Sequence, residues 1–364
     1  MHMMLLVALI APSTKQNHAL NKQLKHQVGE RVLNQTIGRA ASSLTDCLFT
    51  QHEPVIVTLS DVGYADLLYL WAERAAQMGW PQRVVVALDN STYTSVAADV
   101  LEASLPEGRG TCVLPFFPLG RTGREDTGRV GGRGATSRGS RTLPVFTGLA
   151  KLSVLNLLIV GGYDSITLSE MDVFWFSPPW VPLLAVTHPA SLLCLDNYPA
   201  ATHADNAANI GLIHLRRPHG NDGFARRFIA HILGRWRERL LATAGAARLV
   251  VGHEQILLNR ELMAWPDKEE RTRSFALLNR SQFANSRHLE AYGRGRYKVA
   301  YPKGEALRQV KEGLPHAHLE AMLVAFHAIS MAPKAKKALL RRLYAGNLTL
   351  SQFARTQWTA LVSV

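Results

Sequence analysis

The chain has 364 residues, of which 47% are hydrophobic and 19% are charged, and its formal net charge is +13. This composition is that of a globular protein with a sizeable core, in one large domain or two smaller ones, and it excludes a fibrous or wholly disordered chain. The positive charge fits nucleic acid, an anionic membrane or polyphosphate ligands, but no nucleic-acid motif or zinc spacing accompanies it. We therefore interpret it as solvated basic surface and predict no nucleic-acid partner.

Residues 1–51 are predicted to be a stem or a signal-like segment. The apolar stretch from Met4 to Ala11 is shorter than the roughly 18 residues that cross a bilayer, and no positively charged region precedes it. It fits a weak signal peptide, the remnant of an anchor or a buried segment, so membrane association through the N-terminus stays open. Three cysteines are too few for a disulfide framework, and four Asn-x-Ser/Thr sites permit a secretory location.

A strand, a helix and a second strand begin the core. Residues 54–60 are a continuous apolar run, an amphipathic helix follows, and residues 83–89 form a second apolar run that ends on Asp89. Both strands of such a unit end at the same edge of a parallel sheet, which places Thr58, Ser60 and Asp89 there. Asp89 could accept hydrogen bonds from a ribose, or the polar residues could serve only as a helix cap and a turn.

Residues 106–142 are rich in Gly, Arg, Ser and Thr, and they predict a flexible insertion. After them comes a helical pattern up to residue 160, a Gly-Gly turn and a short β-branched strand that ends on Glu170 and Asp172. Carboxylates beyond a buried strand can point into a ligand crevice and suit Mg²⁺ or Mn²⁺. The alternative is that the two acids only cap the turn before Val173.

The stretch from Lys151 to Trp175 resembles the acid-x-Asp segment of the nucleotide-diphospho-sugar transferase family with a GT-A fold, the group with plant and algal arabinosyl- and xylosyltransferases. The matching features are Lys151, Gly162-Tyr163, the strand 166–168, Glu170-x-Asp172 and Phe174-Trp175. Glu170 stands where the family has Asp, which lengthens the side chain by one methylene group. The resemblance implies one GT-A-like α/β domain over residues 52–345, with a mostly parallel sheet flanked by helices and a tail at 346–364.

Further pieces extend the resemblance along the chain. They are the strand and loop at 57–64, the strand that ends on Asp89, the Asn-x-Gly strand that begins at Asn209, the acid-Gln pair at 254–255 and the turn 275–285, followed by a late His and Lys. Glu254 could also serve only the dipole of its helix, and His327 could be a core residue. The resemblance implies these roles: metal ligands Glu170, Asp172 and His327; donor-binding residues Thr58, Leu59, Ser60, Asp89, Lys151 and Lys337; catalytic residues Asn209, Glu254 and Gln255.

The function that the resemblance implies is glycosyl transfer. A glycosyltransferase that requires Mn²⁺ or Mg²⁺ would move a sugar, a pentose or galactose, from a UDP-sugar to a glycan or glycoprotein acceptor with retention of configuration. Its expected location is the Golgi or the secretory pathway, with the cytoplasm as the alternative. One alternative is a catalytically inactive GT-A domain that binds a glycan or a protein. Another is a basic nucleic-acid-binding protein, which only the charge supports.

Overall fold

The computed structural model describes residues 14–47, 49–95, 110–117, 143–179, 190–197, 208–218, 220, 223–242, 253–279, 282–285, 324–328 and 333–346. The helices are α1 (Thr14–Asp46), α2 (Ala65–Gln77), α4 (Leu143–Val160), α6 (Phe224–Ala242), α7 (His253–Met263), α8 (Lys268–Ser274) and α11 (Pro333–Tyr344). The strands are β1 (Val55–Ser60), β2 (Gln82–Ala87), β3 (Thr111–Pro115), β4 (Ser165–Ser169), β5 (Val173–Trp175), β6 (Leu192–Asp196), β7 (Ala208–Arg216), β8 (Phe275–Leu277), β9 (Phe283–Asn285) and β10 (Ala325–His327).

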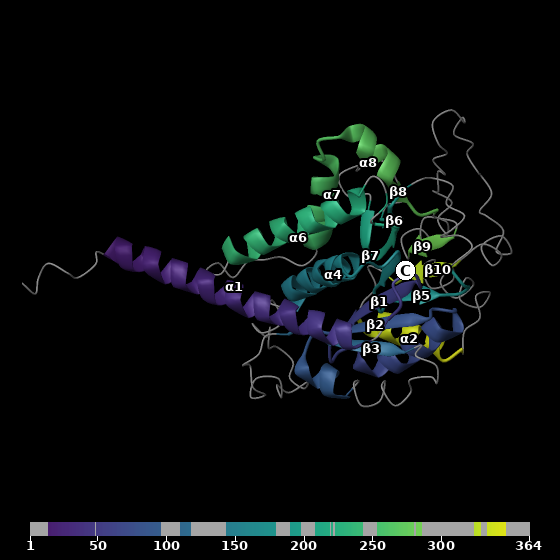
Figure 1. Cartoon of the computed structure of the whole chain (residues 1–364). Coiled ribbons are helices and arrows are strands. Elements are labelled where there is room, and N and C mark those ends of the chain that lie inside the picture. The colour runs from purple at the N-terminus through teal and green to yellow at the C-terminus, as the bar shows by residue number, and fades with distance from the viewer. Residues whose placement is uncertain are drawn as a thin grey trace, which may run out of the picture.

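The central element is a seven-stranded sheet in the order β3-β2-β1-β4-β7-β6-β8, with helices packed around it (Figure 1). Neighbouring strands are parallel on both sides of β1, and β7 is antiparallel to β4 and to β6. Within this sheet β7 alone is therefore reversed. The predicted α/β class with a mostly parallel sheet is confirmed.

The register of the strands brings the predicted polar segments to one edge. Val57 of β1 lies beside Val84 of β2 and Leu168 of β4, so the three parallel strands end together. β7 begins at this same edge, because its residue Leu212 pairs with Ser169 at the end of β4. The segments that carry Thr58, Asp89, Asp172 and Asn209 thus meet at the carboxyl edge of the sheet, where the sequence places Thr58 and Asp89.

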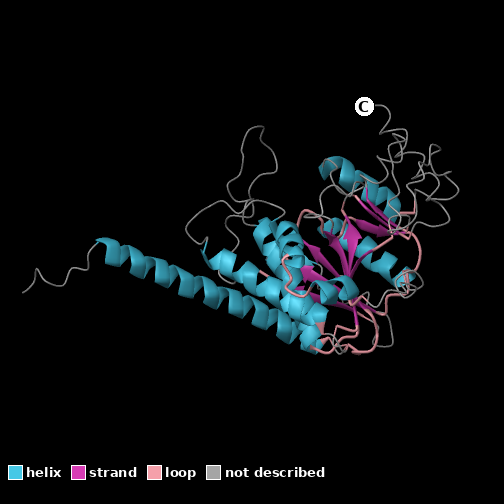
Figure 2. Ribbon diagram, turned by 90° about the horizontal axis from the view of Figure 1, so that it is seen from above, coloured by secondary structure: helices cyan, strands magenta, loops and turns pink. Residues whose placement is uncertain are grey.

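The sheet has an apolar core on each face because successive strand residues point to opposite sides. On β1, Val55, Val57 and Leu59 face a core shared with α1, α4, α6 and α7. Ile56 faces the other core, which is built with α2, α11 and the strands of a small second sheet, β5-β10-β9. Figure 2 shows the helices on the two sides of the strands. The small sheet matters for function, because it lies beside the turn that follows β4.

Helix α1 is 33 residues long, which corresponds to about 50 Å, and its first part extends away from the sheet and the other helices (Figures 1 and 2). Its second part packs through Leu33, Ala40 and Leu44, which are buried in the core, and a disulfide joins Cys47 to Cys112 of β3. The core therefore reaches into the segment that the sequence assigns to a stem. No helix among the described residues is long and apolar enough to cross a membrane.

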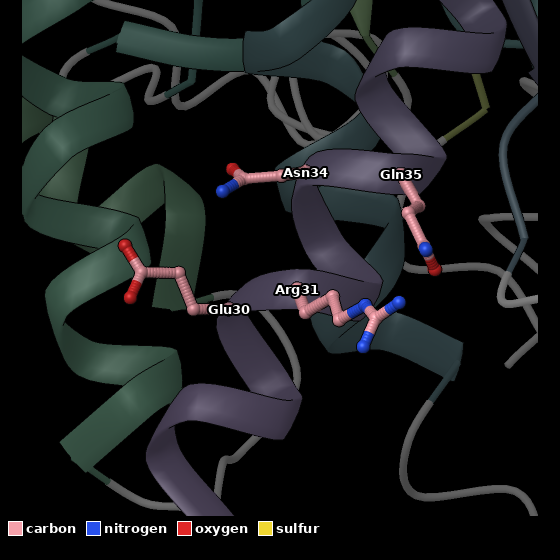
Figure 3. A pocket seen from close by; sticks show the side chains of 4 residues that line it. All are labelled: Glu30, Arg31, Asn34 and Gln35. Carbon is pink, nitrogen blue, oxygen red and sulfur yellow. The ribbon is translucent and has the colours of Figure 1, made fainter.

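A shallow pocket lies beside the middle of α1. Among the residues that the structure describes, its lining side chains come from this helix: Glu30, Arg31, Asn34 and Gln35 (Figure 3). Asn34 accepts a hydrogen bond of 2.7 Å from the guanidinium of Arg237 on α6. This pocket contains none of the residues that the sequence predicts for a site.

The structure corrects one prediction within residues 106–142. Thr111–Pro115 form the buried edge strand β3, paired in parallel with β2, where a flexible insertion was expected. The reason is local, because Cys112, Val113 and Leu114 are three successive apolar residues inside the Gly- and Arg-rich stretch. Residues 106–109 and 118–142 lie outside the described residues, as do Met4 to Ala11 and the predicted tail from residue 347 onward.

Candidate metal centre

The turn between β4 and β5 carries the two acids that the sequence singles out, and the small sheet delivers the histidine. β10 runs antiparallel to β5, with His327 opposite Val173. The backbone N–H of Ala328 donates to the carbonyl oxygen of Asp172 at 2.9 Å, which holds the end of β10 against the turn. Strand pairing thus places His327 next to Asp172, although the two are far apart in sequence.

Three side-chain donor atoms converge at this turn. Nε2 of His327 lies 3.1 Å from Oδ1 of Asp172 and 3.4 Å from Oε2 of Glu170. The three donor atoms all lie within 4.8 Å of one another. The histidine side chain is 3% exposed, that of Asp172 is 12% exposed and that of Glu170 is 27% exposed, so the cluster is accessible mainly at the glutamate.

Each acid divides its two oxygens between partners. Oε1 of Glu170 contacts the ammonium of Lys151, and Oδ2 of Asp172 lies 2.7 Å from Nζ of Lys336 on α11. Nζ of Lys151 also lies 3.6 Å from Oε1 of Glu254, at the start of α7. The result is an alternating row of charges, in the order Glu254, Lys151, Glu170, His327, Asp172 and Lys336. We call this row the charge chain.

The charge chain explains the ionisation of its members. Burial by itself would raise the pKa of Glu170, but the charges of Lys151 and His327 and their hydrogen bonds lower it well below its usual range. Burial would also raise the pKa of Asp172, and His327 and Lys336 lower it. For His327, burial acts to lower the pKa, and the two carboxylates outweigh it and raise the pKa to about 9. The protein alone therefore holds a positive charge between the two acids.

The donor set fits a divalent cation. Two carboxylate oxygens and one imidazole nitrogen form a mixed oxygen and nitrogen set that Mn²⁺ accepts, and only two or three protein ligands are needed when a diphosphate supplies others. Gly211 leaves room for these groups. A Cβ atom at this position would lie 2.3 Å from Cε1 of His327 and 2.9 Å from Oε2 of Glu170. The Glu170, Asp172 and His327 side chains could therefore hold a metal ion.

The predicted donor-binding residues of β1 point into the protein. The side chain of Leu59 is part of the core shared with α1, α4, α6 and α7. Thr58 is fully buried, and the Ser60 hydroxyl donates to the carbonyl oxygen of Asp61 at 3.1 Å. In the loop that follows, Val62 and Gly63 are exposed instead. A donor at this edge would meet the loop rather than these three side chains.

Asp89 serves the chain itself in this structure. Its carboxylate accepts hydrogen bonds from the N–H of Val62 at 2.8 Å, from the N–H of Thr92 at 2.7 Å and from the Thr92 hydroxyl at 2.9 Å. It therefore caps the helical turn that begins at Asn90 and ties it to the loop after β1. This matches the structural alternative considered for the sequence, and the ribose contact stays a prediction.

The three predicted catalytic residues lie in two places. Asn209 is buried at the start of β7, where its side-chain oxygen accepts from the N–H of Gly211 at 2.7 Å and its amide donates to Asn197 at 3.1 Å. It thus holds the glycine that makes room at the cluster. Glu254 and Gln255 lie in the first turn of α7, and Glu254 reaches the charge chain through Lys151.

Sequence reasoning missed Lys336 and Gly211. It singled out Lys337, whose ammonium lies 2.7 Å from Oδ1 of Asp66 and 2.8 Å from the carbonyl oxygen of Gly63. Adjacent residues of a helix are turned about 100° apart, so only one of two neighbouring lysines can face Asp172. The spacing from His327 could not decide which one. The Asn-x-Gly sequence was a signal for Gly211, but its importance comes from the close approach of His327.

No protein-family model matches the chain, and no curated protein matches it. Among solved structures, the chain is similar to the galactosyltransferase LgtC in complex with donor and acceptor sugar analogues, at 13% identity and a TM-score of 0.45 over 80% of this chain and 95% of that one. It is also similar to the glycosyltransferase GlyE of Streptococcus pneumoniae TIGR4, at 13% identity and a TM-score of 0.39 over 85% of this chain and 64% of that one. Both of these solved structures are of glycosyltransferases.

Proposed function

We propose that the chain is a metal-dependent glycosyltransferase that uses a nucleotide diphosphate sugar as donor. The observation that carries the proposal is the convergence of Glu170, Asp172 and His327 at the carboxyl edge of a mostly parallel sheet, where open α/β sheets bind their ligands. Donors of this kind bring a diphosphate, whose negative charge a divalent cation and nearby lysines can neutralise.

The residues of the cluster have distinct tasks in this proposal. Asp172 and His327 would hold the ion directly, and Glu170 would hold it directly or through water. A bound Mn²⁺ or Mg²⁺ supplies Lewis-acid stabilisation of the diphosphate. Lys336, whose side chain is 17% exposed, lies next to Asp172 and adds positive charge where the leaving diphosphate would gather negative charge. It replaces Lys337 in the role that the sequence suggested.

In the transfer, the bond between the anomeric carbon of the sugar and the diphosphate oxygen breaks, and a hydroxyl oxygen of the acceptor bonds to that carbon. The electron pair of the broken bond stays with the nucleoside diphosphate, and the acceptor proton is released. The resemblance supports retention of configuration, a UDP-sugar with a pentose or galactose, and a glycan or glycoprotein as acceptor. Gln255, half-buried in the first turn of α7, remains a candidate for contact with the reacting sugar.

A secretory location is also proposed. The disulfide between Cys47 and Cys112 supports it, because such bonds persist in oxidising compartments and are rare in the cytosol. Localisation of a tagged full chain, together with a comparison of its thiol content before and after reduction, tests this. A chain found in the cytosol with both thiols free would contradict it.

The test of the function is a donor screen by calorimetry and hydrolysis. UDP-galactose, UDP-xylose and UDP-arabinose are offered with Mn²⁺, with Mg²⁺ and with EDTA. We expect UDP to bind only with metal and one sugar nucleotide to be hydrolysed slowly without acceptor, because water replaces the acceptor hydroxyl. NMR of the first product with a real acceptor reports the anomeric configuration. A wild-type chain that binds neither Mn²⁺ nor UDP would end the proposal.

One observation favours the alternative of an inactive binding domain. The charge chain is balanced without any cation, since each acid already has a lysine and shares the histidine. A domain that kept this arrangement as a structural feature would need no metal. Glycan binding that is insensitive to EDTA, with no hydrolysis of any UDP-sugar, would support this alternative over the enzyme.

A further inference from the structure

Lys151 is an unusual charged residue because its side chain is only 2% exposed, on helix α4 between the sheet and α7. Its ammonium contacts Oε1 of Glu170 and lies 3.6 Å from Oε1 of Glu254. These acids come from different elements, the turn after β4 and the start of α7. One buried cation therefore joins two separate parts of the fold.

The approach of α7 to this lysine is built into α4. Gly148 lies three residues before Lys151, on the same side of the helix. A Cβ atom at Gly148 would lie 2.9 Å from Cβ of Glu254 and 3.1 Å from Cζ2 of Trp236. A larger residue would push Glu254 away. The glycine and the lysine together define where the Glu254 side chain stands.

We propose that Lys151 and Glu254 are a positioning pair that fixes the orientation of Glu170, rather than a phosphate ligand and a catalytic acid. Lys151 holds Oε1 of Glu170, which leaves Oε2 directed toward His327 at 3.4 Å. Glu254 holds Lys151 from the other side. The inference rests on the proposed metal site. Lys151 and Glu254 would affect the ion only indirectly, by holding Glu170 in place.

Exposure and contacts argue against a direct contact of Lys151 with the donor. At 2% exposure its ammonium cannot reach a diphosphate in the solvent-accessible part of the edge, whereas Lys336 at 17% can. Its charge is also already shared by two carboxylates. The side chain of Glu170, which Lys151 contacts, is 27% exposed, so the lysine acts on that carboxylate first.

Whether Mn²⁺ affinity falls or rises when Lys151 is removed distinguishes a positioning role from a simple effect of its charge. Removing a lysine near a cation site removes repulsion, so a pure charge effect would make Mn²⁺ bind more tightly. Loss of positioning would weaken Mn²⁺ binding instead. Without Lys151, the negative charge of Glu254 is no longer neutralised, and it would repel the Glu170 carboxylate out of its position. Since outer partners of metal ligands typically contribute 10–100-fold to affinity, we expect the positioning effect to be the larger one.

The experiment is titration of the full chain with Mn²⁺ alone, without nucleotide, by calorimetry. Lys151→Met should weaken binding about tenfold or more, and Lys151→Arg, which restores a cation, should recover part of the loss. Glu254→Gln should weaken it a few-fold, because Lys151 then loses one anchor. Lys268→Met on the exposed surface of α8 makes the same substitution away from the cluster and should leave Mn²⁺ binding unchanged.

The outcomes distinguish this inference from the proposed function. Equal or tighter Mn²⁺ binding by Lys151→Met, with the wild type binding normally, overturns the positioning role and leaves the metal site in place. Unchanged Mn²⁺ binding combined with weaker UDP binding would show a direct donor contact instead. If Lys151→Met does not fold, Glu254→Gln decides, since unchanged Mn²⁺ affinity in that variant also overturns the inference. A wild type that binds no Mn²⁺ refutes the proposed function itself.

Discussion

Two strands of the sheet end in acids at the same edge, and the acids have different surroundings. After β4, Asp172 directs one oxygen to Lys336 and the other to His327, in a cluster that could hold an ion. After β2, both oxygens of Asp89 accept hydrogen bonds from Val62 and Thr92. A buried strand followed by an acid is therefore not sufficient for a ligand site. The deciding factor is whether nearby backbone N–H groups already satisfy the carboxylate, as those of Val62 and Thr92 do for Asp89.

The difference between the two acids arises from the segment on the C-terminal side of each one. A helical turn begins at Asn90, and its free N–H groups are the natural partners of an acid just before it. After Asp172 the chain enters β5, whose N–H groups face β10, and β10 brings His327 instead. The same residue type thus serves as a cap in one place and as a candidate ligand in the other.

The largest expected effect is that of Asp172→Asn. It should weaken Mn²⁺ binding about 100-fold or more, because it removes an anionic ligand, with little change in the fold. Asp89→Asn is the matched control, with the same substitution after another strand of the same sheet. It should leave Mn²⁺ affinity unchanged in the same titration. A comparable loss in both variants would break the distinction between the two acids.

Substitution of the two other candidate ligands, His327 and Glu170, should reduce Mn²⁺ affinity by smaller amounts. His327→Ala should weaken Mn²⁺ binding less than Asp172→Asn, because a water molecule can replace one neutral ligand. Glu170→Gln should weaken Mn²⁺ binding least of the three variants if Glu170 contacts the ion through water. Calorimetry on the three variants gives the order directly, and Glu170→Gln as the most damaging of the three would place this acid in direct contact with the ion.

Gly211→Ala tests the close packing of the cluster. The added Cβ would meet His327 and Glu170, so we expect Mn²⁺ affinity to fall about tenfold and stability to fall by about 1–3 kcal/mol. Gly234→Ala on α6 is the control, because a Cβ there meets nothing within 4 Å. Its stability should stay the same or rise by about 0.5–1 kcal/mol in urea unfolding. Normal Mn²⁺ binding by Gly211→Ala would show that the cluster can move apart.

Asp89→Ala tests whether Asp89 serves only as a helix cap. Loss of the cap should lower the free energy of unfolding by about 1 kcal/mol, measured in urea, with Mn²⁺ affinity unchanged. Titration with UDP and Mn²⁺ then examines the predicted ribose contact. If UDP affinity also falls tenfold, the carboxylate binds the donor in addition to capping the turn, and the contrast between Asp89 and Asp172 is too strict.

Thr58→Val should have the smallest effect. The Thr58 hydroxyl is buried and has no hydrogen-bond partner among the residues that the structure describes. Replacing it by a methyl group removes an unsatisfied polar group, so stability should stay the same or rise by about 1 kcal/mol. UDP affinity should not change, since this side chain points into the core. A clear loss of UDP affinity would mean that the donor supplies the missing partner.

The sequence by itself determined most of the fold. Apolar or β-branched runs at β1, β2 and β4 predicted these parallel strands within one or two residues, because strands buried on both faces need no polar alternation. It also placed Thr58 and Asp89 at one edge, since the direction of both strands in a strand-helix-strand unit follows from the handedness of the connection. β3 was missed because a short apolar run inside a Gly- and Arg-rich stretch carries little periodic signal.

Only the tertiary structure decided what the individual side chains do. The pairing of β10 with β5 put His327 beside Asp172, and the rotation of α11 chose Lys336 over Lys337. Burial placed Lys151, which the resemblance assigns to donor binding, in contact with Glu170 and 3.6 Å from Glu254. These outcomes depend on contacts between segments that are distant in sequence, and side-chain direction there is set by packing. The local sequence pattern predicts where a strand lies and which way it runs. It does not predict which residues from distant segments will pack against its side chains.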